Sequence, residues 1–330
     1  MQKELLISTK IHIDSKDIYK IKPLINSYSY GDFRKYRVLS INDQSNYLFN
    51  QILDIAKTPD NCIFVCSDKK NIRGFAVLKY LEWDSKHFDQ DMRQITYLIT
   101  KEDYSEAIKI KSSLLKAILK YNKKIDNAHL SCKIDTLDIT SIHVLESFGF
   151  KLMDTIITWV FKPVINFPKY KNIYKVRDFQ EKDLEELMDL AKHRFSMNRF
   201  HLDPNIPNDK ADKMYAEWVK NYCLNSAKGN TKVKVAENKN GVAGFLGYRL
   251  NEGIKKTTGH RIIGQGLMAI KPSAKGASIN LINTTIKDVI LNYDFAEFDG
   301  LITNHEAIKI YQAFNFEIIR SKHTFHFLRE

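Results

Sequence analysis

The sequence has few of the residues that mark a metal site, a disulfide-bonded protein or a membrane protein. Its four cysteines, Cys62, Cys66, Cys132 and Cys223, include no CxxC pair and accompany no histidine cluster, so we expect no metal site and no redox pair. No apolar run approaches the roughly 20 residues that span a membrane, and residues 1–10 already carry charges where a leader would be apolar. These absences predict a cytoplasmic protein with reduced, buried thiols and no membrane partner.

The sequence also lacks the concentrated basic segments of nucleic-acid-binding proteins. Its formal net charge is +12, yet its lysines are spread evenly and are interleaved with acidic residues. A moderate positive potential would still raise the local concentration of a small molecule that carries phosphates. We therefore expect a phosphorylated small molecule as the anionic partner and expect no nucleic acid.

Both halves of the sequence show the same order of elements. Each contains two strands around a turn, a further strand, a helix that ends in an aromatic-rich turn and a closing strand. Aligning Gly149 with Asn315 pairs Leu145 with Tyr311 and needs no gap. This self-similarity predicts a duplicated domain.

The chain is long enough for two hydrophobic cores, because 44% of its 330 residues are hydrophobic. We predict domains at residues 1–165 and 172–330. The linker is expected at residues 162–175, where Pro163, Pro168 and a run of Lys, Asn and Tyr interrupt the periodicity of both helices and strands.

Glycine is scarce in the first half, with none between Gly74 and Gly149. In the second half the segment KPSAKGAS, residues 271–278, joins an expected strand at 261–270 to an expected helix at 280–293. A glycine turn that opens a helix directs backbone N–H groups and the positive end of the helix dipole at one point, which suits an anion. The alternative is a plain helix start, but the corresponding stretch of the first half has no glycine.

A second difference between the halves is Tyr311, which aligns with Leu145. In the expected helix at 306–314 the apolar positions form a stripe, with Tyr311 at its flank. These apolar positions are Ala307, Ile310, Ala313 and Phe314. The alternative reading of Tyr311 is a core residue with a hydrogen-bonded hydroxyl. Asn304, at the strand-to-helix junction, favours a functional role for the pair.

The segment TNHEAIKIYQAFNFE, residues 303–317, resembles the N-x-x-A-x-x-x-Y-x-x-x-G-F signature of the GNAT acyl-CoA N-acyltransferases. IKPSAKGASINLI, residues 270–282, resembles their pyrophosphate loop. Ser273, Ser278 and Asn315 depart from the usual residues, although serine is small and asparagine tolerates a left-handed backbone. The resemblance implies an α/β (α+β) fold of tandem GNAT-like domains, each with a mixed, mostly antiparallel central sheet flanked by helices.

A closer resemblance is to enzymes of the dTDP-fucosamine N-acetyltransferase type, which acylate nucleotide-linked amino sugars. It is carried by LEWDSKHF at 81–88, GFKLMDTIITW at 149–159, NRFHLDPNIP at 198–207 and MYAEWVKN at 214–221, while residues 1–60 have no counterpart. It implies a degenerate first domain that contributes acceptor-site residues and a second domain that binds acyl-CoA. The implied product is a dTDP-linked 3-amino- or 4-amino-dideoxyhexose, N-acylated for surface polysaccharide synthesis.

The resemblance also assigns cofactor residues. Tyr311 is implied to protonate the departing thiolate. Pantetheine is expected to run along a strand, and the carbonyl oxygen to accept hydrogen bonds from its backbone N–H groups. Asn304 is implied to contact the cofactor near its thioester, or simply to cap the helix. The remaining implied contacts are Leu267, Met268 and Ala269 with pantetheine, and Lys275, Gly276, Ala277 and Ser278 with the pyrophosphate.

For the general base the resemblance points to Asp154, with an exposed acid at a strand start as the equal alternative. Glu82, Trp83 and Asp84 have a composition suited to binding a sugar or a nucleobase, although Trp83 is more typical of a packed residue. We expect the acceptor's phosphates to meet Arg199 and His201. The helical spacing of Tyr215, Trp218 and Tyr222 indicates a core stripe, with one of the three as a candidate for lining the acceptor cleft.

Several alternatives stay open at this point. The donor is acetyl-CoA or another short acyl-CoA, such as 3-hydroxybutanoyl-CoA, and neither the acyl group nor the position of the amine on the sugar is readable from the residues. Rival readings are a GNAT enzyme that acts on a peptide, polyamine or antibiotic amine, and a non-catalytic module that binds acyl-CoA. The nucleotide carrier, the role of residues 1–60 and a homodimeric state are equally open.

Overall fold

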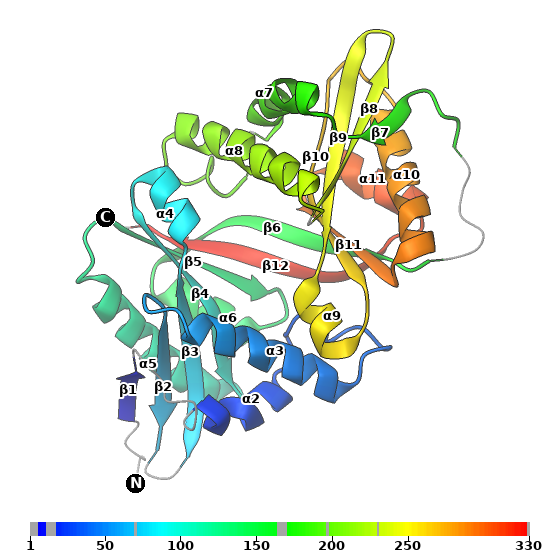
Figure 1. Ribbon diagram of the computed structural model, residues 1–330. Coiled ribbons are helices and arrows are strands. Elements are labelled where there is room, and N and C mark those ends of the chain that lie inside the picture. The colour runs from blue at the N-terminus through cyan, green and yellow to red at the C-terminus, as the bar shows by residue number, and fades with distance from the viewer. Residues whose placement is uncertain are drawn as a thin grey trace. The chain divides into compact units, whose positions relative to one another are not determined.

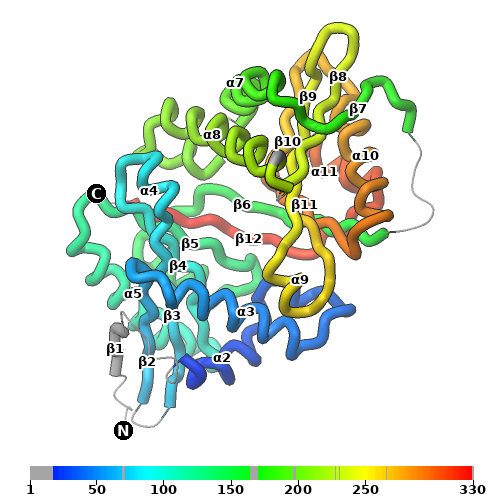
Figure 2. The backbone as a smooth tube through the Cα atoms, viewed as in Figure 1, coloured from blue at the N-terminus to red at the C-terminus, as the bar shows by residue number. Residues whose placement is uncertain are grey.

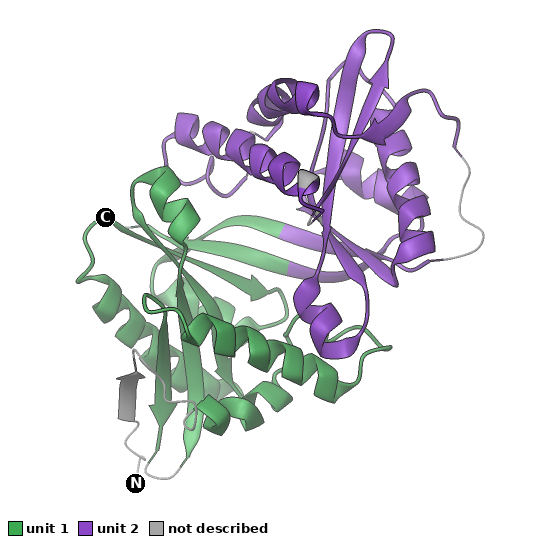
Figure 3. Cartoon of the chain, viewed as in Figure 1, with its two compact units in different colours: residues 1–155, 322–330 green, residues 156–321 purple. Residues whose placement is uncertain are grey.

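Figure 1 shows the computed structural model of the chain, which describes residues 6–10, 18–68, 71–163, 170–195, 198–229 and 231–328. Figure 2 follows the same backbone as a tube. The chain forms two compact units: unit 1 comprises residues 1–155 and 322–330, and unit 2 comprises residues 156–321 (Figure 3). In the described part of the chain, no helix has the length and apolar character that crossing a membrane requires.

Unit 1 contains the strands β1-β2-β3-β4-β5 and the end of β12 from residue 322, in this order in the sheet. Only β4 and β5 are parallel among these neighbours. The strands are β1 (Leu6–Lys10), β2 (Cys62–Ser67), β3 (Ile72–Tyr80), β4 (Asp91–Thr100), β5 (Ala128–Asp135) and β12 (Glu317–Phe327). The hairpin β2–β3 confirms the two strands expected around residues 68–71.

Both faces of the unit 1 sheet are covered, which explains why β2 and β3 are almost continuously apolar. Alternate residues of β2 enter different cores: Phe64 packs with one cluster and Val65 with the other. The first cluster is closed by α5 (Tyr104–Asn122) and α6 (Ile139–Ser147). The second is closed by α2 (Lys22–Ser27) and α3 (Ile41–Ala56), so the segment before residue 60 covers one face of this sheet.

Unit 2 repeats the arrangement with the strand order β6-β11-β10-β9-β8-β7, in which only β10 and β11 are parallel. The strands are β6 (Phe150–Phe161), β7 (Lys175–Asp178), β8 (Lys232–Asn238), β9 (Gly241–Leu250), β10 (Ile262–Ile270) and β11 (Phe295–Leu301). Of β6, residues 156–161 belong to unit 2 and residues 150–155 to unit 1. The helices are α7 (Leu184–Arg194), α8 (Asn208–Ala227), α9 (Glu252–Thr258), α10 (Ala277–Asn292) and α11 (His305–Ala313). Within this unit α7 and α8 lie on one side of β8–β10, and α10 and α11 lie on the other (Figure 1).

The two units confirm the predicted duplication and the mixed, mostly antiparallel sheets. In each unit a hairpin leads into a strand, a long helix and a second strand parallel to the first. A short helix and a closing strand follow. Equivalent helices end alike, because the left-handed residue after α6 is Gly149 with φ 85° and the one after α11 is Asn315 with φ 60°. Asparagine therefore does replace glycine at this C-terminal turn, as expected for a residue that tolerates positive φ.

The compact units do not follow the order of the chain. Lys322 pairs with Asp135 and Phe327 pairs with Leu130, so the end of β12 completes the sheet of unit 1. The division into residues 1–165 and 172–330 stays a prediction about which segments fold independently. Within the expected linker, residues 164–169, including Pro168, lie outside the described residues.

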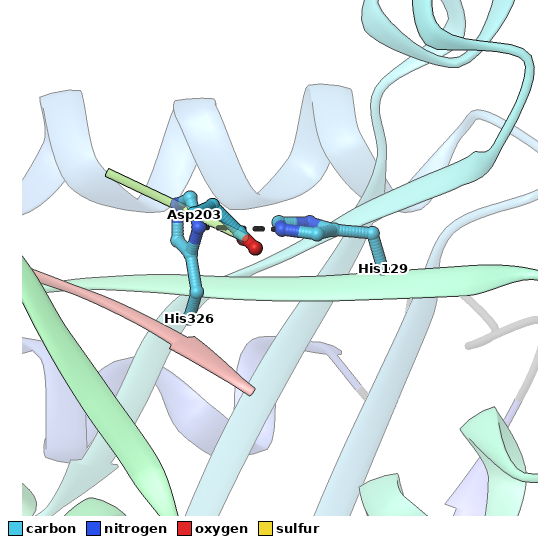
Figure 4. A group of neighbouring side chains, drawn as sticks. All are labelled: His129, Asp203 and His326. Atoms are coloured by element: carbon cyan, nitrogen blue, oxygen red, sulfur yellow. Dashed lines mark hydrogen bonds between the residues drawn. The ribbon is translucent and has the colours of Figure 1, made fainter. Parts of the chain in front are cut away.

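The pairing of β12 with β5 also brings two buried histidines together. Nε2 of His129 lies 3.3 Å from Nδ1 of His326, with the two rings nearly perpendicular (Figure 4). These residues are 197 positions apart in the sequence. Spacing along the chain, on which the expectation of no histidine cluster was based, cannot reveal such a pair.

Candidate functional site

The helix α10 begins at a glycine turn, as the sequence predicts. Gly276 is the N-cap and adopts φ 87°, a left-handed conformation that is easy only for glycine. Its helix has no acidic residue in the first turn and receives no side-chain hydrogen bond at the cap. The first N–H groups of a helix have no partner within the helix, so this end presents donors and partial positive charge. Lys275 beside it is exposed.

The equivalent helix of unit 1 has the opposite character. Asp103 is the N-cap of α5, and its carboxylate accepts a hydrogen bond from the Glu106 N–H at 3.2 Å. Glu106 adds a second carboxylate in the first turn. Two carboxylates satisfy this helix end and repel other anions. Of the two equivalent helix starts, that of α10 is therefore the one suited to a phosphate group.

A buried asparagine fixes the first turn of α10. Asn280 is 1% exposed, and its Oδ1 accepts hydrogen bonds from the N–H groups of Ile173 and Tyr174 at 3.0 Å and 2.9 Å. Its Nδ2 donates to the carbonyl oxygen of Lys171 at 3.0 Å. The segment that enters unit 2 is thus tied to the helix start, which holds the glycine turn in one place.

The strands β10 and β11 separate in the middle of the sheet and form a fork. Their parallel pairing runs only from Ile262 opposite Phe295 to Gly264 opposite Glu297. Beyond that point β10 stays paired with β9 as far as Ile270, and β11 stays paired with β6 as far as Leu301. Inner-edge backbone groups of both arms therefore lose their strand partner and are available to a ligand.

A β-bulge lies on the β10 arm of the fork. Gln265 pairs with Tyr248 and Met268 pairs with Leu246, so two residues of β10 oppose Gly247 alone. These two residues are Gly266 and Leu267. The bulge redirects the backbone at the place where the sequence analysis expected N–H donors to a carbonyl oxygen. Leu267 and Ala269 are buried and Met268 is partly buried.

Tyr311 occupies the centre of the buried face of α11, and the expected stripe is wrong in this respect. Ala313 is exposed, whereas Tyr311 is 1% exposed and Ala307 is buried. The ring of Tyr311 lies 4.9 Å from that of Trp159 and 5.5 Å from that of Phe298. A helix buries the residues one turn apart, and Tyr311 follows Ala307 at that spacing.

Tyr311 contacts a residue of the β11 arm of the fork. Phe298 is the first residue of β11 beyond the last β10–β11 pair, and its ring meets that of Tyr311 edge to face. Asn304 is exposed at the N-cap of α11, where its Oδ1 accepts a hydrogen bond from the Ala307 N–H at 3.1 Å. Asn304 therefore caps α11, which was one of the two roles expected for it. Contact with a cofactor remains a prediction.

In unit 1 the helix that corresponds to α11, α6, begins at a buried ion pair that was not predicted from the sequence. Nζ of Lys111 lies 2.8 Å from Oδ1 of Asp138, the N-cap of α6, and 2.7 Å from the hydroxyls of Thr140 and Ser141. The side chains of Lys111 and Asp138 are only 4% and 1% exposed. Burial lowers the pKa of Lys111, against the opposing effect of Asp138. The gap-free alignment, which pairs Asp138 with Asn304, is the signal that could have found it.

The acceptor residues predicted in unit 1 lie on the short helix α4 (Glu82–Phe88), directly after β3. Trp83 is 42% exposed and stacks on His87, with ring centroids 5.4 Å apart and an interplanar angle of 8°. Trp83 therefore packs on a side chain of its own helix and stays partly exposed, and its part in acceptor binding stays a prediction. Glu82 is exposed and pairs with Lys86 at 2.6 Å, and Asp84 is half-buried.

In unit 2, Arg199 and His201 lie in the loop that precedes α8. The Arg199 guanidinium covers the ring of Phe200 at 4.3 Å. His201 is engaged through both ring nitrogens, with Nδ1 2.6 Å from Nδ2 of Asn198 and Nε2 2.9 Å from Oδ1 of Asp212. These contacts hold the loop, and binding of phosphate by the two residues stays a prediction.

Asp154, the expected base, is a half-buried residue of β6 and belongs to unit 1, whereas Tyr311 belongs to unit 2. Its role stays a prediction. All four cysteines are free and buried, as expected. Burial raises the pKa of the Cys66 thiol to about 11 and that of Cys223 to about 12, so these thiols are protonated at neutral pH.

Comparison with known proteins identifies the fold. A tandem GNAT protein from the clavulanic acid biosynthesis pathway has a similar structure, with a TM-score of 0.56 and 10% sequence identity. The match spans 98% of this chain and 98% of that protein. The GCN5-related N-acetyltransferase from Sphaerobacter thermophilus is also similar, with a TM-score of 0.60 and 8% sequence identity. That match spans 97% of this chain and 95% of that protein. The chain therefore has the tandem GNAT fold.

At the level of sequence the likenesses are weak. No protein-family model matches the chain. The spore coat polysaccharide biosynthesis protein SpsD of Bacillus subtilis (strain 168) is 22% identical over 198 residues. The match covers 59% of this chain and 64% of SpsD, so the chain spans a little under two thirds of that relative.

Proposed function

We propose that this tandem GNAT chain is an acyl-CoA-dependent N-acyltransferase with its donor site in unit 2. The observation that carries the proposal is the coincidence, in one unit, of a fork between β10 and β11 and an uncapped glycine start to α10. Unit 1 has the same parallel pair, but carboxylates close its helix start, and the cap of its α6 is a carboxylate in a buried ion pair with Lys111. The contrast within one chain argues for a single donor site.

The residues of unit 2 fit coenzyme A. Its pyrophosphate would meet the Ser278 N–H at the α10 start, with the Lys275 ammonium beside it. Gly276 and Ala277 would line the turn, and the Ala277 N–H already donates to the Ala274 carbonyl oxygen at 3.1 Å. The amides of pantetheine would pair with the open edge of β10 from Leu267 to Ala269, in the manner of a strand added to the fork. Acyl-CoA supplies the activated thioester carbonyl.

The chemistry assigned to the chain's own residues is proton transfer and charge stabilisation. The acceptor nitrogen forms a bond to the carbonyl carbon, the C–S bond breaks, the amine loses a proton and the thiolate gains one. Backbone N–H groups of the β10 bulge would donate to the carbonyl oxygen as it becomes negative. We assign the proton donor to the Tyr311 hydroxyl, at the fork, and the proton acceptor to Asp154.

We assign the acceptor to an amino group on a nucleotide-linked, dTDP-type amino-dideoxysugar in polysaccharide synthesis. Support comes from the likeness to a relative named for spore coat polysaccharide biosynthesis and from the four sequence stretches that resemble amino-sugar acetyltransferases. The exposed, stacked Trp83 on α4 offers a flat apolar face of the kind that sugars and bases bind. A peptide, polyamine or antibiotic amine is the rival acceptor.

The test is a thiol-release assay with a matrix of acyl-CoAs against dTDP- and UDP-linked amino sugars. A thiol reagent can report the released coenzyme A, because the protein's own cysteines are buried and contribute little background. We expect turnover with a dTDP-amino sugar and none with its N-acetylated product. Turnover with a polyamine or peptide but with no amino sugar would refute the acceptor. Binding of acyl-CoA without turnover for any amine would indicate a non-catalytic module.

A further inference from the structure

Tyr222 on α8 lies directly on the bulge of β10. A Cβ atom at Gly266 would stand 2.1 Å from Cζ and 2.3 Å from the hydroxyl oxygen of Tyr222. A Cβ atom at Gly247, the residue of β9 opposite the bulge, would stand 2.9 Å from Cδ1 of the same ring. Non-bonded carbon atoms do not approach this closely, so the ring occupies the space of two missing side chains.

The contact is therefore a matched set of three residues from three elements. Only glycine at positions 247 and 266 lets the Tyr222 ring reach the backbone of both strands. The bulge of unit 1, where Thr96 is the extra residue opposite Val77 and Leu78, has no glycine. A tyrosine could not approach that bulge in the same way. The arrangement belongs to the unit that has the uncapped helix start.

The place of this contact on the fork gives it a function. Gly266 is the second residue of β10 beyond Gly264, where the pairing with β11 ends. The helix start of α10 follows the far end of β10 on one side of the sheet, and α8 covers the other side (Figure 1). With acyl-CoA placed as proposed, a thioester chain that runs from the α10 start along β10 would reach Tyr222 at the bulge.

We infer that Tyr222 is the end wall of the acyl pocket and restricts the donor to a two-carbon acyl group. The inference rests on the proposed function, because it needs acyl-CoA in the fork. The ring is held by close backbone contact with two strands, so it cannot yield to a longer chain without moving α8. Burial raises the pKa of Tyr222, which keeps the hydroxyl neutral beside the thioester. Acetyl-CoA is accordingly the preferred donor over 3-hydroxybutanoyl-CoA.

The experiment compares Tyr222→Ala, Tyr222→Phe and the unaltered protein with acetyl-CoA, butanoyl-CoA and 3-hydroxybutanoyl-CoA. We expect Tyr222→Ala to raise the ratio of kcat/KM for butanoyl-CoA over acetyl-CoA by roughly tenfold or more, since the wall is removed. Tyr222→Phe keeps the ring and should change the ratio less than about threefold. Tyr215→Ala is the matched control: Tyr215 is a buried tyrosine of the same helix that stacks on Phe195, and its loss should not alter the ratio.

A second measurement tests the contact itself through folding. Gly266→Ala should lower the melting temperature, because its Cβ meets the Tyr222 ring. Combining Gly266→Ala with Tyr222→Ala should recover part of that loss. Turnover with an unchanged donor ratio in Tyr222→Ala overturns the inference and leaves the proposed function standing. Failure of the unaltered protein to bind any acyl-CoA, measured by calorimetry, overturns both.

Discussion

Asp138 and Asn304 cap equivalent helices with almost the same backbone geometry. Their φ and ψ angles are −81° and 67° for Asp138, and −84° and 73° for Asn304, and each side chain accepts a hydrogen bond from the N–H three residues later. One is a carboxylate paired with the buried Lys111, and the other is a neutral, exposed amide. The equivalent helix caps are thus part of an internal ion pair in unit 1 and an exposed amide in unit 2.

Breaking that ion pair should destabilise the protein without affecting the donor site. Lys111→Met leaves the Asp138 carboxylate buried without its cation, which typically costs about 3–5 kcal/mol of unfolding free energy. The double variant Lys111→Met with Asp138→Asn should recover a large part of that loss, because asparagine can still cap α6. Urea unfolding of the unaltered protein and of the two variants measures this. Equal stability of the single and double variants would contradict it.

The anion site at α10 can be tested with two substitutions that match in shape and differ in charge. Gly276→Asn and Gly276→Asp both place a side chain at a φ of 87°, which asparagine and aspartate tolerate better than other residues. The carboxylate of the Asp variant opposes the pyrophosphate at the positive helix end, an effect of about 1–2 kcal/mol. We expect the Asp variant to bind coenzyme A roughly 5 to 30 times more weakly than the Asn variant by calorimetry. Equal affinities would remove the pyrophosphate from this turn.

Tyr311→Phe should lower kcat by roughly 100-fold or more, as expected when a general acid is lost, and should leave the affinity for coenzyme A nearly unchanged. The matched control is Tyr248→Phe. Tyr248 is another buried tyrosine of unit 2, its hydroxyl donates to Asp288 at 2.6 Å, and it has no part in the proposed proton transfer. That variant should lose stability and keep its kcat. Full turnover by Tyr311→Phe would return Tyr311 to a purely structural role.

Asp154→Asn should reduce turnover, because the amine loses its proton acceptor while the donor site in unit 2 is untouched. The affinity of this variant for coenzyme A should stay unchanged and serves as the internal control. Asp209→Asn, at an exposed residue paired with Lys213, is the control for a general change of charge. If Asp154→Asn turns over at the rate of the unaltered protein, the base lies elsewhere.

Acid stability depends on the pair of Arg177 and Asp183 next to β7. Burial would raise the pKa of Asp183, but hydrogen bonds from Arg177 and from the Gln180 N–H outweigh it and hold that pKa below its usual value of 3.8. A depressed carboxyl pKa stabilises the fold fully above about pH 5 and loses its contribution as the pH falls below about 4. Asp183→Asn should therefore lower the melting temperature at pH 7 more than at pH 3.

The elements that local patterns govern were predictable from the sequence. The hairpins, the helix start at Gly276 and the turn at Asn315 follow from alternation, from glycine and from residues that tolerate positive φ. The position of Tyr311 was misjudged because the predicted stripe counted Ala313, which is exposed, and left out Tyr311, whose neighbours in the fold are Trp159 and Phe298. An aromatic surface of that size is usually buried, whatever its hydroxyl does.

Long-range relationships could not be predicted in this way. Lys111 and Asp138 meet across 27 residues, and Tyr222 meets glycines on two strands that follow it in the chain. The packing of α2 and α3 on the sheet of unit 1 could not be predicted, because a helix that covers a sheet needs only an apolar face, which many sequences provide. Such contacts arise from the packing of elements, and a single sequence carries no record of which faces meet.

The pairing of β12 with β5 has a consequence for biosynthesis. Unit 1 cannot complete its sheet until residues 322–327 have left the ribosome, by which time all of unit 2 has been made. Chains usually fold domain by domain during synthesis, and the earlier domain comes first. In this chain the edge of β5 stays without its β12 partner until the end of β12 is made, whereas unit 2 can form its core earlier. Chaperone demand during translation should accordingly concentrate on the first unit.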